Sequence, residues 1–163
     1  MKSIFLIPAL LFTTAFFAQT TTETRPVGDF TCIHVSAAID AEITQGDACA
    51  VTVEGSEQDI KNLKTEVKDG VLSISGAISP GDRETKVKVT VKNLQMLDVS
   101  GSSSTTSTNK IITDSLKITG SGASEMKLDV QAAGIKTNLS GASVLRISGS
   151  TSTINAELSG ASQ

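Results

Sequence analysis

The chain has 163 residues, which is enough for one hydrophobic core. Its 14 Lys and Arg residues against 17 Asp and Glu residues give a formal net charge of −3, which excludes a basic protein that binds nucleic acid through its phosphates. There is no Trp or Tyr, and every Phe except Phe30 lies within the first 17 positions. One ring in the rest of the chain cannot form an aromatic platform for bases or sugars.

Residues 1–18 are typical of a secretion signal. Lys2 supplies a positive start, and the apolar run over residues 4–17 is too short to span a membrane as a helix. Cleavage after Ala18 is one interpretation, and cleavage after Ala15 is the alternative. We therefore expect an exported protein without a transmembrane segment, in the periplasm, on the outer surface or outside the cell. Residues 19–26 are polar and end in proline, which predicts an extended lead-in.

Two cysteines, Cys32 and Cys49, could form a disulfide in an oxidising compartment. Alternation along the chain places Cys32 on the face opposite Ile33 and Val35, whereas Cys49 lies on the same face as Val51 and Val53. This parity favours two free thiols, and the bridge stays open as the alternative. His34 is the only histidine and lies on the same strand as Cys32, so it does not supply that thiol with a general base.

Apolar and polar residues alternate from Phe30 onward, which predicts half-buried strands around residues 33–35, 39–43 and 51–53. Ser56, followed by acidic residues and then by Ile60 and Leu63, predicts one helix of about two turns. Asp69-Gly70 lies between two alternating runs and predicts a tight hairpin, because both positions tolerate positive φ. Another strand with a basic outer face is predicted around residues 87–91.

A repeat dominates the C-terminal part. Ser-Gly-Ala-Ser occurs at 121–124, 140–143 and 159–162, nineteen residues apart, and a weaker copy, Ser-Gly-Ser-Ser, occurs at 100–103. Aligned at this spacing, apolar residues fall on apolar residues, which predicts a β-solenoid whose rungs each have two short strands and two corners. The predicted corner residues are Gly101, Ser121, Gly122, Ala123, Ser124, Ser140, Gly141, Ala142, Ser143, Ser159, Gly160, Ala161 and Ser162. Small side chains stack there without clashing, and glycine permits the turn.

The chain resembles the family of putative auto-transporter adhesin, head GIN domain proteins, found mainly in exported proteins of Bacteroidetes-like bacteria. The resemblance covers roughly residues 27–163 and rests on residues 30–35, 39–47 and 63–74 and on the Ser-Gly-Ala-Ser repeats. It implies an all-β, right-handed helix-like fold and an extracytoplasmic location, and it brings no catalytic residues.

The expected organisation is therefore a signal peptide (1–18), a lead-in (19–26) and one domain (27–163). Within that domain we expect a strand-rich part with the short helix (27–98), followed by the right-handed solenoid of period nineteen (99–163).

We expect a non-enzymatic adhesin or cell-envelope interaction module with no catalytic residues, no cofactor and no metal, whose surface, glycan or protein ligand cannot be named. One alternative is a structural subunit of the envelope that associates with itself through its open last rung, residues 154–158. Another alternative is a polysaccharide-cleaving enzyme. It is less favoured because such enzymes need two carboxyl groups that face each other. The acids of the repeat region are scattered, and none falls on another acid at the nineteen-residue spacing. They are Asp98, Asp114, Glu125, Asp129 and Glu157.

Overall fold

The computed structural model describes residues 20–36, 38–76, 78 and 85–163. The predicted signal peptide, residues 1–18, lies outside them. The described part contains one helix, α1 (Glu57–Asn62), and twelve strands. The strands are β1 (Thr21–Arg25), β2 (Cys32–Ser36), β3 (Asp40–Gln45), β4 (Ala50–Gly55), β5 (Lys64–Lys68), β6 (Val71–Ser75), β7 (Lys86–Val91), β8 (Met96–Ser100), β9 (Ser104–Ser107), β10 (Ile111–Gly120), β11 (Glu125–Leu139) and β12 (Val144–Leu158).

Alternation of side chains explains why the N-terminal runs form strands. In β2, Ile33 and Val35 are fully buried, while the alternate residues Cys32 and His34 are half-buried on the other face. β5 and β6 form the predicted antiparallel hairpin, in which Asp69 and Gly70 have φ of 51° and 75°. Both positions therefore adopt the left-handed region that a tight two-residue turn requires.

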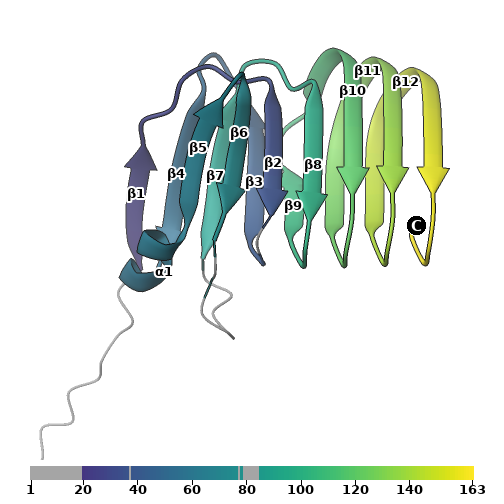
Figure 1. Cartoon of the computed structure of the whole chain (residues 1–163). Helices are drawn as coiled ribbons and strands as arrows, with labels where there is room; N and C mark the ends of the chain where they lie inside the picture. The colour runs from purple at the N-terminus through teal and green to yellow at the C-terminus, as the bar shows by residue number, and fades with distance from the viewer. Residues whose placement is uncertain (1–19, 37, 77, 79–84) are drawn as a thin grey trace, which may run out of the picture.

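The predicted helix begins where its capping residue indicated. Ser56 is the N-cap, and its hydroxyl accepts a hydrogen bond of 3.2 Å from the backbone N–H of Asp59. Ile60 and the C-cap residue Leu63 are both buried. α1 is thus a short helix that joins β4 to β5 at one end of the sheet (Figure 1), and Ile60 and Leu63 belong to the hydrophobic core.

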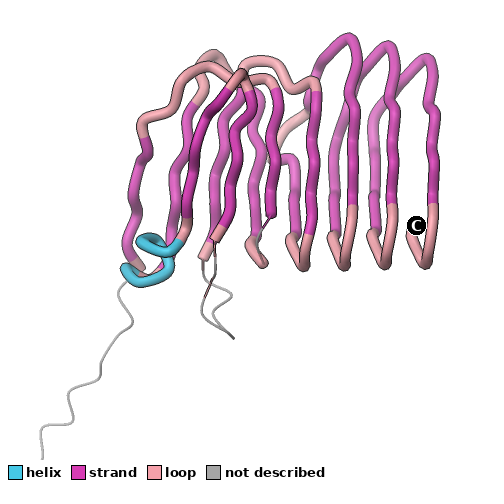
Figure 2. The backbone as a smooth tube through the Cα atoms, viewed as in Figure 1, coloured by secondary structure: helices cyan, strands magenta, loops and turns pink. Residues whose placement is uncertain are grey.

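All twelve strands belong to one mixed sheet, whose main path runs β1-β4-β7-β3-β9-β11-β10-β8-β2-β6-β5. The path turns over at β11, because residues 125–127 of β11 pair with β9 while residues 130–139 pair with β10. One arm of the sheet therefore faces the other (Figures 1 and 2). β12 lies beside β11 along almost its whole length and extends the same end of the molecule. Pairing is antiparallel in β1-β4-β7 and β5-β6 and parallel elsewhere.

The predicted fold class is correct in being all-β with one short helix, but the right-handed solenoid with short two-strand rungs is wrong. The eleven strands of the main path form one mixed, nearly closed barrel. Where two short strands per unit were expected, β11 and β12 are single strands of 15 residues that bend between the two layers. The strand-rich part does not precede a separate stack either, since β2 pairs with β8 and β3 pairs with β9 inside the same sheet.

Arg25 bridges the gap between the two ends of the path, β1 and β5. Its guanidinium donates to the backbone carbonyl of Ile60 at 2.6 Å, to that of Leu63 at 2.5 Å and to the Thr65 hydroxyl at 3.2 Å. β1 itself lies within residues 19–26, where an extended lead-in was expected, and it pairs antiparallel with β4. One side chain thus links the first strand to the helix end and to the last strand of the path.

Aliphatic side chains fill the space between the two layers. Leu97 and Val99 from one arm and Ile43 and Val89 from the other have at most 1% exposure. Phe30 is the only Phe, Tyr or Trp among the described residues and is also buried. Each fully buried aliphatic side chain contributes about 1.5–3 kcal/mol, so many small contributions replace the few large ones that aromatic residues supply.

Both cysteines are free thiols. The Cys32 sulfur lies 3.7 Å from the hydroxyl of Thr31, and the Cys49 thiol donates to the backbone carbonyl of Phe30 at 3.6 Å. The structure therefore agrees with the interpretation that the parity of the two strands favoured.

Candidate functional site

The predicted corner residues lie in a row at one end of the long strands, where Figure 2 shows successive loops side by side. Their glycines, Gly101, Gly122, Gly141 and Gly160, all have positive φ, between 72° and 80°. The backbone N–H of Ala123 donates to the carbonyl of Gly101 at 2.8 Å, and the same bond joins each later corner to the one before it. A Cβ at Gly122 would lie 2.7 Å from the Gly101 oxygen, so only glycine fits this stack.

The serines of the corners are largely engaged with the protein itself. The fourth residue of each of the two central corners, Ser124 and Ser143, is buried, and their hydroxyls lie 3.1 Å apart. Ser143 also donates to the carbonyl of Ser140 at 2.7 Å, and Ser162 makes the equivalent bond to Ser159 at 2.6 Å. Three corners expose an alanine, at Ala123, Ala142 and Ala161, and the exposed Ser140 and Ser159 donate to the carbonyls of Gly120 and Leu139. The corners therefore hold the strands together and offer few polar groups to a ligand.

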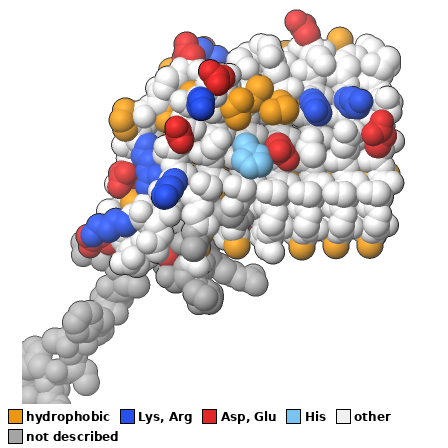
Figure 3. Space-filling model, viewed as in Figure 1, with side chains coloured by type: hydrophobic (Ala, Val, Ile, Leu, Met, Phe, Trp, Pro, Cys, Tyr) orange, Lys and Arg blue, Asp and Glu red, His pale blue; other side chains and the backbone are white. Residues whose placement is uncertain are grey.

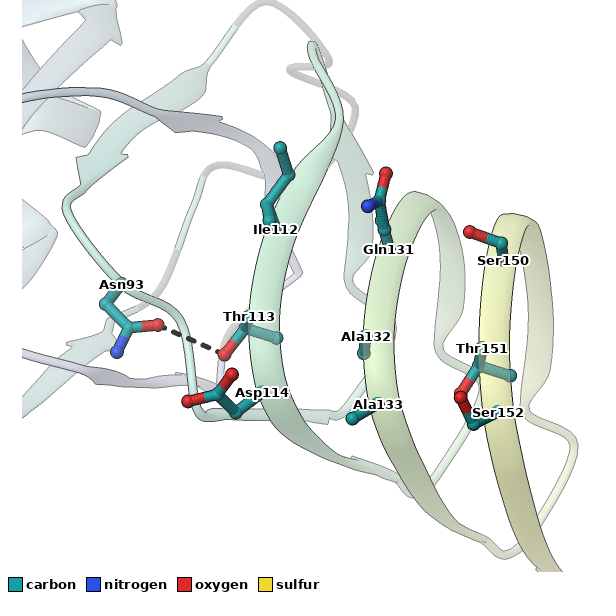
Figure 4. A pocket seen from close by; sticks show the side chains of 10 residues that line it. All are labelled: Asn93, Ile112, Thr113, Asp114, Gln131, Ala132, Ala133, Ser150, Thr151 and Ser152. Carbon is teal, nitrogen blue, oxygen red and sulfur yellow. Dashed lines mark hydrogen bonds between the residues drawn. The ribbon is translucent and has the colours of Figure 1, made fainter.

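A groove of about 630 Å³ lies where β10, β11 and β12 bend at the opposite end of these strands. Figure 4 shows three neighbouring turns of chain side by side, with Asn93 and Asp114 toward one end and Ser152 toward the other. Each turn contributes three consecutive residues, and adjacent parallel strands are about 4.8 Å apart. The lining residues are Asn93, Ile112, Thr113, Asp114, Gln131, Ala132, Ala133, Ser150, Thr151 and Ser152.

Gln45, at the end of β3, fixes the first turn of the groove. Its side-chain amide accepts a hydrogen bond of 2.6 Å from the Ile112 backbone N–H and donates one of 2.9 Å to the Ile112 carbonyl. A further bond from Gln45 reaches the carbonyl of Lys92 at 3.0 Å. Thr113 in turn donates to the side-chain oxygen of Asn93 at 3.1 Å, the bond drawn in Figure 4. This edge of the groove is therefore held by side chains rather than by strand pairing alone.

Thr151 of the third turn donates its hydroxyl to the backbone carbonyl of Thr153 at 2.9 Å, but four other polar side chains of the groove are unengaged. Within the described residues, the side chains of Asp114, Gln131, Ser150 and Ser152 make no hydrogen bond to the protein. They offer one carboxylate, one amide and two hydroxyls, distributed over three adjacent turns. Ile112, with 57% exposure, adds an apolar side chain at the first turn. No Lys or Arg lines the groove, so its chemistry suits an uncharged polar ligand better than an anionic one.

Sequence reasoning missed this groove. The lining side chains are common surface types, and no motif distinguishes them. The usable signal was the nineteen-residue spacing, which aligns residues 112–114, 131–133 and 150–152.

His34 does not stand alone on its strand. Its Nδ1 lies 3.0 Å from a carboxylate oxygen of Asp98 on β8, and both side chains are about one-third exposed. Figure 3 shows the single histidine beside an acidic side chain on the open outer face of one layer. Ser73 is the neighbour of His34 on the other side, on β6, but no bond joins that hydroxyl to the ring. The pair is therefore a cross-strand contact between β2 and β8 on this face.

The acids weighed for polysaccharide cleavage do not face one another in a site. Asp98 binds His34, Asp114 lies in the groove, and Glu125 pairs with Arg146. Asp98 and Glu157 share an outer face, but β10 and β11 lie between their strands, which corresponds to about 14 Å at the usual spacing. Glycoside hydrolysis requires carboxyl groups about 5–10 Å apart. Asp129, the fifth acid, is half-buried on β11.

In the described part of the chain, no group of three or more His, Cys, Asp or Glu side chains is placed to hold a metal ion. The same residues include no helix whose length and apolarity would let it cross a membrane.

Comparison with known families identifies the chain. The family model described as "Putative auto-transporter adhesin, head GIN domain" matches residues 29–163, and the chain belongs to this family. The resemblance inferred from the sequence is therefore confirmed. No curated protein sequence matches the chain.

Solved structures share the fold at low sequence identity. A putative adhesin from Parabacteroides distasonis is 20% identical with a TM-score of 0.63, over 82% of this chain and 67% of that one. A putative adhesin from Bacteroides fragilis is 12% identical with a TM-score of 0.61, over 88% and 95% of the two chains. A putative lipid binding protein from P. distasonis is 22% identical with a TM-score of 0.59, over 81% and 67%. At these identities the likeness shows the fold alone.

Proposed function

We propose that this protein is an exported, non-enzymatic adhesin that binds a neutral glycan chain in the groove formed by β10, β11 and β12. The observation that carries the proposal is the alignment of unengaged amide, hydroxyl and carboxylate groups on three adjacent turns. A linear polymer can contact all three turns at once, and several weak polar contacts on one chain add up to useful retention. The adhesin names of the family and of two structural neighbours support this assignment.

Lipid binding, the property named for one structural neighbour, is less well supported by this chain. Fully buried aliphatic side chains occupy the space between the two layers, where an acyl chain would have to lie. The groove itself is lined mainly by polar and small residues. Its contents favour hydroxyl-rich ligands over hydrocarbon.

Retention on immobilised dextran and on amylose, both uncharged glucose polymers, tests the proposal. The double variant Gln131→Leu with Ser150→Ala removes an amide and a hydroxyl from two turns of the groove. We expect its retention to be about tenfold lower than that of the wild type, since each lost hydrogen bond costs roughly 0.5–1.5 kcal/mol. Thr106→Ala, which removes a hydroxyl of β9 outside the groove, should leave retention unchanged. Absence of wild-type retention on all neutral polysaccharides tried, or equal loss in the control, would count against the proposal.

Residues 1–18 act as a signal peptide that is removed during export, and the sheet from β1 onward lies outside the cytoplasm. Adhesion requires exposure at the cell surface. Protease treatment of intact cells should therefore degrade the protein, whereas a periplasmic protein would survive until the outer membrane is opened.

A further inference from the structure

β12 presents an open edge at the end of the barrel, at the right of Figure 1. Within the described residues it pairs with β11 on one side and has no strand on the other. It is 15 residues long, whereas β1 and β5 at the ends of the main path have five residues each and are bridged by Arg25. Ile154 and Leu158, at the open end of the core, are 59% and 57% exposed. An edge of this length with exposed aliphatics favours pairing with another strand.

We propose that two copies of this chain join through their β12 strands as an antiparallel, two-fold symmetric pair. The pairing sets Ile147 of one copy opposite Ala156 of the other, and Arg146 opposite Glu157. Because the interface is isologous, every contact occurs twice. Each β12 edge is thereby covered by the β12 edge of the other copy, so the assembly stops at the dimer and no further chain can add there.

Backbone hydrogen bonding supports this register. The N–H of Val144 donates to Ser124 and that of Ser159 to Leu139, both on the β11 side, at 2.8 Å and 2.9 Å. Because backbone groups alternate in direction along a strand, those of Ile147 and Ala156 point toward the open edge. A directly opposed antiparallel pair needs both residues to do so. The N–H of Leu145 already donates to the carbonyl of Gln163 at 2.9 Å, so the open stretch begins after Leu145.

Side-chain direction gives the same answer independently. Ile147 and Ala156 extend the buried rows that run through Leu128 and Thr137 of β11, so both face the core. Arg146 lies beside the exposed Lys127 of β11, and Glu157 lies beside the half-buried Asn138. In the proposed register, inward residues meet inward residues and outward residues meet outward residues. A shift of one residue would break this match on both faces.

Charge complementarity selects this register among those with the correct parity. Arg146 and Glu157 are the only charged residues of β12, and they have opposite signs. A shift of two residues in either direction would place Arg146 opposite Asn155 or Ser159 instead. Opposite charges directly across an antiparallel pair are stabilising. Arg146 also pairs with Glu125 in its own chain, and its exposed guanidinium can serve both carboxylates.

Sedimentation equilibrium of the purified full chain, together with charge swaps, tests the proposal. We expect a reversible dimer whose Kd rises at least about tenfold in Arg146→Glu and in Glu157→Arg, because each variant creates two repulsive contacts. The double variant R146E/E157R should return to within about threefold of the wild-type Kd, since the opposed charges are exchanged. Lys117→Glu, on the outer face of β10, should leave the Kd unchanged.

Cross-linking gives a second measurement that does not depend on those charges. In the proposed register Ser148 lies opposite Asn155 of the second copy as a pair without backbone bonds, about 4.5 Å apart at Cα, which suits a disulfide. With Cys32 and Cys49 replaced by serine, a mixture of Ser148→Cys and Asn155→Cys proteins should oxidise to a covalent dimer containing one of each. Each protein alone should form far less.

Three results would overturn the proposal. They are a monomer at every concentration up to about 1 mM, assemblies larger than the dimer, and a double charge swap that stays as dissociated as the single variants. Cross-linking that is no more efficient in the mixture than in the separate proteins would also reject this register.

Discussion

Gly122 shows how a single residue permits the stacked corners. Its φ is 76°, and an added Cβ would lie 2.7 Å from the Gly101 carbonyl oxygen. We expect Gly122→Ala to destabilise the protein by roughly 2–4 kcal/mol, because it combines a left-handed backbone with a clash against backbone atoms. Urea denaturation measures this loss. Gly28→Ala is the control, since nothing lies within 4 Å of its Cβ position, and it should change stability by less than about 0.5 kcal/mol. Equal effects would contradict the stacking argument.

Asp29 provides a second test at the residue scale. The Lys92 ammonium donates to its two carboxylate oxygens at 2.9 Å and 3.0 Å, and this hydrogen bonding, helped by the positive charge, holds the pKa of Asp29 below its ordinary value of 3.8. A lowered carboxyl pKa contributes stability above pH 3.8 that is lost as the pH falls through the folded-state value. In Lys92→Met, an NMR titration should show the Asp29 pKa rising toward 3.8.

Lys88→Met is the matched control for that titration. Lys88 lies on β7, whereas Lys92 follows directly after that strand, and Lys88 pairs with Glu54 instead, at 2.7 Å. The pKa of Asp29 should be the same in this variant as in the wild type. A pKa of Asp29 that does not respond to loss of Lys92 would show that the ion pair does not persist in solution.

Individual side-chain directions were largely predictable from the sequence. The burial of Ile33 and Val35, the free Cys32 and the cap at Ser56 all follow from short-range alternation or from a local motif. The bond between His34 and Asp98 could not be predicted, since 64 positions separate the two residues. A local pattern determines which face a side chain occupies, whereas its partner on that face depends on which strands become neighbours.

At the scale of elements, Arg25 links β1 to the end of α1 and to β5. It donates to two backbone carbonyls and one hydroxyl, and its side chain is 13% exposed. We expect Arg25→Met to cost about 1.5–3 kcal/mol, because hydrogen bonds from a charged donor are lost and the carbonyls lose their partner. Hydrogen exchange should become faster in β1 and α1 first. Lys64→Met, an exposed neighbour on β5, should have little effect, and equal losses in both would refute the role of Arg25.

Between the corners, the strands differ from the two short strands per unit that the repeat predicted. Glycine flanked by small residues marks a turn unambiguously, and the nineteen-residue spacing fits the pairing of β11 with β12. The apolar rows on the two sides of each bend suggested two separate strands, but backbone pairing continues through the bend in β11 and β12. β1 was missed because its residues are mostly exposed and polar, so no apolar alternation indicated a strand.

At the scale of the whole molecule, one sheet joins the N-terminal and C-terminal parts. β2 and β3 pair with β8 and β9, so neither part has a complete core of its own. We expect a single cooperative unfolding transition. Circular dichroism at increasing urea concentration should coincide with hydrogen exchange of β2 and of β11. Two transitions, with the C-terminal strands outlasting the rest, would indicate a separable stack.

The overall fold could be predicted only in class. A repeat determines how its own copies stack, but it does not reveal how earlier strands distribute themselves between two facing layers. The groove has the same origin, since residues 112–114, 131–133 and 150–152 become neighbours only after three turns align. Chemistry that arises from such alignment leaves no motif in any single segment.

Ile112 at the groove also has a practical value. The protein contains neither Trp nor Tyr, so it is almost silent in the spectral range where proteins normally fluoresce. Ile112→Trp would introduce the only tryptophan of the molecule at this exposed position. Its emission maximum would shift when a ligand entered the groove. Because native Trp and Tyr are absent, the fluorescence of one introduced Trp could be measured with almost no background from the protein itself.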